Sequence, residues 1–74
     1  MTKVTSENVL VDSSLVKHMH YMNETKNLYV TFSNGTIYRY SNVDSATYQD
    51  VRNSDSIGKA LHKKIFNVYE YRKI

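Results

Sequence analysis

The chain has 74 residues, which is enough for one small domain with a modest core and too few for two domains. It contains no cysteine, so neither a disulfide framework nor a thiolate metal site can add to that core. The formal net charge is +3, but residues 59–74 carry five lysines and arginines against Glu70 alone, a net of +4, whereas the rest of the chain sums to −1. This asymmetry fits either a patch that binds an anionic partner or lysines solvated on the back of a helix.

The N-terminal stretch interrupts its apolar residues with polar ones, so it lacks the apolar region of a signal peptide. The chain also has no run of about 20 apolar residues that could cross a membrane. We therefore expect a cytoplasmic protein without membrane contact. Residues 1–10 are expected to be a partly ordered N-terminal segment and residues 11–74 to form the domain. The VLVDSS stretch (residues 9–14), which spans this boundary, either leads into the first strand or forms a short strand of its own.

Two alternating segments follow. In LVKHMHYM (residues 15–22), Leu15, Met19 and Tyr21 have one parity, and Val16 has the other together with His18, His20 and Met22. Turn-forming residues in NETKN then precede LYVTF (residues 28–32), where Leu28, Val30 and Phe32 alternate with more polar positions. Both segments are predicted to be strands.

The Asn34-Gly35 pair indicates a hairpin that can adopt two registers. A two-residue loop would place Tyr38 and Tyr40 on the face opposite Leu28 and Val30. A three-residue loop, with Gly35 in the left-handed conformation of a bulge, would pair Val30 with Tyr38 and Leu28 with Tyr40. We favour the second register because so small a domain needs both tyrosines in its core, although this register turns Ile37 outward.

The remaining segments predict two short helices and a closing strand. Asp44 or Ser45 can cap a helix whose inner face carries Thr47, Tyr48 and Val51. In a second helix, capped by Asp55 or Ser56, the inward residues are Ile57, Ala60, Leu61 and Ile65. The alternating VYEYRKI segment then closes the sheet. The expected fold is a small α+β domain of order βββααβ, with an antiparallel sheet of three to four strands and two short helices on one face.

The order and spacing of these features resemble the KTSC domain, a small family named after the C-terminal extension of certain lysyl-tRNA synthetases and also found as free-standing bacterial and phage proteins. The matching positions are Ser13-Ser14, Tyr21, Leu28-x-Val30-x-Phe32, Asn34-Gly35, Tyr38-x-Tyr40, Val43, Tyr48, Ser56-x-Gly58-Lys59, Ile65 and Tyr69-x-Tyr71. The family usually has proline after the valine, where this chain has Asp44. Its function is unsettled, and the resemblance implies at most RNA binding, which has been suggested from domain context.

Exposed aromatic side chains beside cations would suit single-stranded RNA, because bases stack on rings while cations neutralise phosphates. The candidate residues for RNA or partner binding are Tyr29, Arg39, Lys59, His62, Lys63, Lys64, Arg72 and Lys73. The family-motif residues expected to be structural are Gly35, Tyr38, Tyr40, Ser56, Gly58, Tyr69 and Tyr71. The alternative function is protein recognition, as an adaptor or an inhibitor of a host protein, and the oligomeric state stays open.

Other chemistry has little support in the sequence. His18 and His20 share a strand face, but no third metal ligand lies near them. Asp55, Ser56 and His62 are close in sequence, but no strained elbow or oxyanion-hole motif accompanies them. No glycine-rich phosphate loop is present. We therefore expect a binding module without a metal, a cofactor or an enzymatic activity.

Overall fold

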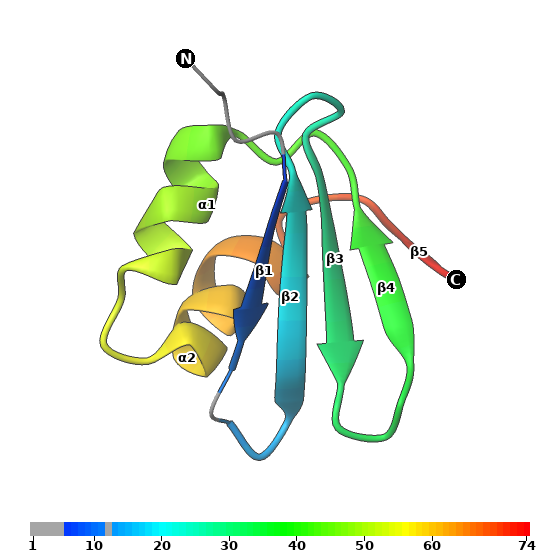
Figure 1. Ribbon diagram of the computed structural model, residues 1–74, viewed down its shortest axis with the longest axis vertical. Coiled ribbons are helices and arrows are strands. Elements are labelled where there is room, and N and C mark those ends of the chain that lie inside the picture. Colours follow the sequence, from blue (N-terminus) through cyan, green and yellow to red (C-terminus); the bar gives the residue numbers. More distant parts are fainter. Residues whose placement is uncertain (1–5, 12) are drawn as a thin grey trace.

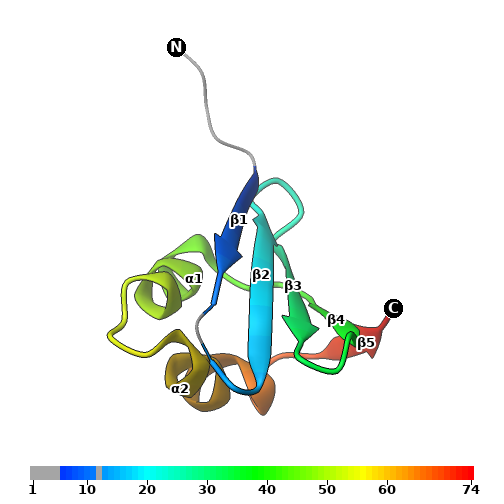
Figure 2. The same ribbon diagram turned by 60° about the horizontal axis from the view of Figure 1, so that its bottom comes forward.

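The computed structural model describes residues 6–11 and 13–74. Five strands and three helical segments occur in the order β1 (Ser6–Leu10), β2 (Val16–Met22), β3 (Asn27–Phe32), β4 (Ile37–Tyr40), α1 (Ser45–Arg52), α2 (Ile57–Leu61), η1 (His62–Phe66) and β5 (Tyr71–Lys73). The strands form one antiparallel sheet in the order β1-β2-β3-β4-β5. The helical segments lie on one side of this sheet (Figures 1 and 2). The predicted α+β class is thus confirmed.

The sheet has five strands rather than the expected three or four, because residues 6–10 form a strand of their own. This strand, β1, pairs with β2 through a register that places Glu7 opposite Tyr21 and Val9 opposite Met19. Val9 packs against the core, and Glu7 Oε1 accepts a hydrogen bond from the hydroxyl of Tyr48 in α1. Residues 1–5 of the predicted N-terminal segment lie outside the described residues.

The hairpin between β3 and β4 has the predicted three-residue loop. Val30 faces Tyr38 and Leu28 faces Tyr40. The N–H of Gly35 donates to the carbonyl oxygen of Phe32 over 2.9 Å, and the φ of Gly35 is +92°. Only glycine adopts this left-handed conformation without strain, so the bulge fixes the register. Ile37 points outward, as this register requires.

Strand β2 departs from simple alternation. Val16 pairs with Phe32, but His18 pairs with Thr31, so Lys17 is an extra residue in a bulge. The bulge brings Val16 onto the same face as Met19 and Tyr21, whereas Leu15 is 40% exposed. Leu15 therefore does not share a face with Met19 and Tyr21, although simple alternation gives the three residues one parity.

Both helices begin and pack as the sequence predicts. Asp44 holds the N-cap position of α1, although its side chain makes no capping hydrogen bond, and Tyr48 and Val51 of this helix are buried. Ser56 caps α2 by accepting a hydrogen bond from the Lys59 N–H. The second helix continues to Phe66, but its last turn, η1, is π-helical. Such a turn includes an extra residue and shifts the side chains that follow it.

Gly58 has a packing role in α2. A Cβ atom at this position would lie 2.8 Å from Ser13 Oγ and 3.3 Å from Ser13 Cβ. The Ser13 hydroxyl also accepts the N–H of Leu15. Because both Ser13 atoms would have to move, glycine allows α2 to approach the segment before β2. This close approach explains two of the motif positions noted in the sequence, Ser13 and Gly58.

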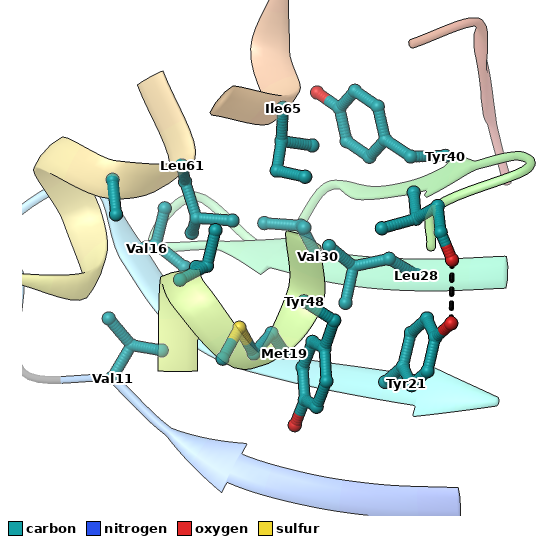
Figure 3. Packing of buried hydrophobic residues seen from close by; sticks show 13 residues of the cluster. Val11, Val16, Met19, Tyr21, Leu28, Val30, Tyr40, Tyr48, Leu61 and Ile65 are labelled. Carbon is teal, nitrogen blue, oxygen red and sulfur yellow. Dashed lines mark hydrogen bonds between the residues drawn. The ribbon is translucent and has the colours of Figure 1, made fainter. Parts of the chain in front are cut away.

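The core lies between the sheet and the helices (Figure 3). Its largest fully buried side chains are Met19, Leu28, Leu61, Ile65, Val16, Val30, Val43 and Val51. Tyr21 and Tyr48 stack at 4.3 Å, and the Tyr21 hydroxyl donates to the Val43 carbonyl over 2.6 Å. Burial raises the pKa of both phenols, and for Tyr48 the hydrogen bond to Glu7 adds to the rise. Both hydroxyls therefore stay protonated and can act as donors.

The closing strand is shorter than the alternation from Val68 predicts. Residues 67–70 form a turn, and β5 comprises only Tyr71–Lys73. Val68 is accordingly 61% exposed. Among the described residues, no helix is long and apolar enough to cross a bilayer.

Candidate nucleic-acid interface

The two faces of the sheet have different surroundings. One face packs against the helices, and the other, which we call the open face, has no helix over it (Figures 1 and 2). Among the side chains that the structure describes, alternation and the observed registers assign these to the open face: Asn8, Leu10, His18, His20, Met22, Asn27, Tyr29, Thr31, Ile37, Arg39 and Arg72. None of these is a carboxylate.

Five of these residues form a continuous line across all the strands. Asn8 lies opposite His20, His20 opposite Tyr29, Tyr29 opposite Arg39, and Arg39 opposite Arg72. We call this line the central row. Directly paired residues on one face have Cβ atoms about 5 Å apart, so each side chain can contact the next. The row therefore places an aromatic ring between an imidazole and two guanidinium groups.

Local contacts hold the aromatic half of the central row. The His20 and Tyr29 rings meet edge-on, with their centres 6.3 Å apart. His20 Nδ1 forms a hydrogen bond with Asn8 Oδ1, and His20 Nε2 lies 3.2 Å from the Met22 sulfur. These contacts order His20 and so support one edge of the Tyr29 ring.

The two arginines of the central row form no ion pair within the described part of the chain. The described residues form two ion pairs, Arg52 with Glu7 at 2.8 Å and Lys64 with Asp50 at 3.9 Å. Neither involves Arg39 or Arg72. Beside these arginines is a surface hollow of about 640 Å³, which is lined by Arg39, Ser41, Phe66, Asn67, Val68, Tyr69, Glu70, Tyr71 and Arg72. The two guanidinium groups thus border a space that a ligand can enter.

The eight predicted binding residues lie on three different parts of the structure. Tyr29, Arg39 and Arg72 come together in the central row. Four others belong to the second helix and are exposed there, namely Lys59, His62, Lys63 and Lys64. Lys73 pairs with Tyr38 and so points to the helix side of the sheet. The basic C-terminal region is therefore not one continuous surface.

The predicted structural tyrosines differ in exposure. Tyr40 is only 3% exposed, and burial raises its pKa to about 12, with smaller contributions from Tyr71 and Tyr38. Tyr38 is half-buried, and the Tyr69 hydroxyl donates to Thr47 Oγ1. Tyr71, by contrast, is 57% exposed. Tyr40 therefore has the predicted structural role in the core, whereas the exposure of Tyr71 does not fit a role in the core.

The residues considered for metal binding and catalysis have other contacts. His18 and His20 do lie on one face, but residues 6–11 and 13–74 include no group of three or more histidine, aspartate or glutamate side chains able to hold a metal ion. Ser56 caps α2, and the His62 ring packs edge-on against Phe66 at 4.8 Å. These contacts give Ser56 and His62 structural roles.

The model of the KTSC domain family matches residues 12–69, well over half of the chain. The chain belongs to the KTSC domain family. Among solved structures, it is similar to the crystal structure of a KTSC domain protein from Yersinia pestis, with a TM-score of 0.83 and 24% sequence identity over 93% of this chain and 97% of that one. At this identity the likeness supports the fold only. A comparison with curated proteins finds no match.

Proposed function

We propose that this KTSC domain is a non-catalytic module that binds single-stranded RNA through the open face of its sheet. The observation that carries the proposal is the central row, in which Tyr29 lies in register between His20 and Arg39, with Arg72 beyond. A base can stack on the aromatic half while the adjacent phosphates contact the two arginines.

Single-stranded RNA fits this surface better than a duplex. In a duplex the bases stack on one another, so their faces cannot pack on a tyrosine ring. Each stack of an unpaired base on an aromatic side chain contributes about 1–3 kcal/mol, and guanidinium groups add charge-assisted hydrogen bonds to phosphate. One or two stacks with two phosphate contacts account for binding in the micromolar range.

The direct test is fluorescence anisotropy with a labelled single-stranded RNA, with the same sequence as a duplex, and with bulk tRNA as a competitor. The single strand should bind more tightly than the duplex. Because two arginines contact phosphates, log K should fall with log[salt] with a slope of about −1.4. The absence of binding at low salt would remove the RNA proposal.

A specific observation favours protein recognition as the second candidate. Beside the central row, Leu10 and Ile37 lie on the open face and are 86% and 36% exposed, and Ile74 follows β5 opposite Ile37 and is 63% exposed. Leu10 lies at the β1 edge and the two isoleucines lie at the β4–β5 end, and exposed aliphatic side chains on one face can mark a protein interface. A stoichiometric partner that is lost on both Tyr29→Ala and Leu10→Ser, together with no RNA binding, would favour this function.

A further inference from the structure

The helix side of β4 and β5 carries aromatic rings that no helix fully covers. Tyr38 lies 5.1 Å from Tyr71 and 5.3 Å from Phe32, and Phe66 lies 5.4 Å from Phe32, all between ring centres. We call these four residues the aromatic ledge. Figure 1 shows α1 and α2 over the β1–β2 end of the sheet, while β4 and β5 extend away from them. η1 contributes Phe66 to the ledge.

Tyr71 is the most open part of the ledge and is nonetheless held in place. It is 57% exposed, yet its ring lies 5.1 Å from Tyr38 and 5.5 Å from Tyr40. Tyr40 in turn is buried in the core. The contacts with Tyr38 and Tyr40 already restrict the Tyr71 side chain, and part of its ring is exposed to solvent. A flat ligand that stacks on this ring therefore costs little additional side-chain entropy.

The charge around the ledge favours an anionic ligand, because Lys73 and the two arginines of the adjoining hollow outnumber its one carboxylate, Glu70. Lys73 pairs with Tyr38 across the two strands, on the same side of the sheet. Lys73 forms no ion pair with any residue in 6–11 or 13–74. Flat rings beside a free ammonium group match a nucleotide, which combines a planar base with a phosphate.

The ledge and the open face meet at β5. Arg72 points to the open face, whereas Tyr71 and Lys73, on either side of it in the chain, point to the ledge. The 640 Å³ hollow is lined from both surfaces, by Arg39 and Arg72 and by Phe66 and Tyr71. Because β5 lies at one edge of the sheet, an RNA strand can pass around it from the open face to the ledge without crossing another strand.

We propose that the aromatic ledge is a second nucleotide-binding site, and that a single RNA strand runs from the open face around β5 to stack a base on Tyr71 beside Lys73. This proposal rests on the RNA-binding function proposed above. It adds a second site on the other side of the sheet and predicts that longer RNA binds more tightly than short RNA, because only a longer strand reaches both surfaces.

The experiment compares oligouridylates of about 4 and about 12 nucleotides against the wild type, Tyr71→Ala, Tyr71→Phe and Arg39→Glu. Tyr71→Ala should weaken binding of the longer RNA about tenfold, within the range of one lost stack, and should remove most of its advantage over the shorter RNA. Tyr71→Phe keeps the ring and should retain the affinity. Because Tyr71 is exposed, circular dichroism should confirm that each variant is folded.

The outcomes separate the two proposals. If Tyr71→Ala leaves the longer RNA unaffected while Arg39→Glu weakens it, the ledge proposal is overturned and the open-face proposal stands. If only Tyr71→Ala weakens it, the open-face proposal fails and so does the path around β5, and the ledge remains as an RNA-binding site on its own. If the wild type binds neither RNA, both proposals are overturned. Should Tyr71→Ala not fold, NMR of the wild type decides, since a stacked base must shift the Tyr71 ring protons upfield, and unshifted signals contradict the ledge.

Discussion

Leu61→Ala is expected to lower the free energy of unfolding by about 3–5 kcal/mol. Leu61 comes from α2 and is fully buried among the core residues of the sheet and helices (Figure 3). Truncation removes buried apolar area and leaves a cavity that close-packed neighbours fill only in part. A domain of this size has only about 4–11 kcal/mol of stability, so this one change should bring it close to unfolding at moderate temperature.

Leu10→Ala provides the matched control for this prediction. It makes the same chemical change at a side chain that is 86% exposed, so its effect should stay within about 0.5 kcal/mol. Urea denaturation followed by circular dichroism gives both values, and the urea dependence of the free energy should be similar in the two proteins. Equal unfolding midpoints for the two variants would contradict the assignment of the core.

The double variant Arg39→Glu, Arg72→Glu is expected to weaken binding of single-stranded RNA by at least about a hundredfold. Each arginine should lose a charge-assisted hydrogen bond to phosphate of about 1.5–3 kcal/mol, and the new carboxylates repel the backbone. The slope of log K against log[salt] should also approach zero. Arg39 and Arg72 form no ion pair within the described residues, so the exchange breaks no such pair in the fold.

The control for charge alone is Lys59→Glu, Lys63→Glu, since neither lysine forms an ion pair within the described residues. It changes the net charge by the same amount but acts on α2 and η1, away from the open face. At moderate salt, exposed charges separated by more than about 10 Å are largely screened, so this variant should weaken binding only a few-fold. If it weakens binding as much as the arginine variant, binding follows net charge and the central row has no special role.

Much of the fold could be predicted because local chemistry determines it. Gly35 in a left-handed bulge and the need to bury Tyr40 together select one hairpin register out of two. Ser56 begins α2 because its hydroxyl can satisfy an N–H that the helix leaves free. Membership of the KTSC family, inferred from the order of these positions, is also confirmed.

The errors in the fold arise where one extra residue changes the pattern. The bulge at Lys17 moves Val16 inward and Leu15 outward, and no turn residue marks it in the sequence. The short polar segment before Val11 gives a weak strand signal, because an edge strand needs only one partner and few apolar residues. β5 begins at Tyr71 because the π-helical turn and the turn after it use the residues from His62 to Glu70.

The candidate site was only partly predictable for a similar reason. Alternation alone separates Tyr29 from the core, and it correctly places Arg39 on the same face. The alignment with His20 and Arg72 depends on strand registers, which link residues far apart in the chain. The clustering of cations in the sequence left open a binding patch or solvated lysines on a helix, and η1 and β5 present Lys63 and Arg72 on different sides of the sheet.

The most direct test of the RNA-binding surface is a titration of the isotopically labelled protein with single-stranded oligouridylate, followed by amide and side-chain chemical shifts. The largest shift changes should follow the central row, at Asn8, His20, Tyr29, Arg39 and Arg72, and should saturate at one RNA per protein. Changes confined to Lys59, Lys63 and Lys64, with Tyr29 and Arg39 unaffected, would contradict the assignment of the open face as the binding surface.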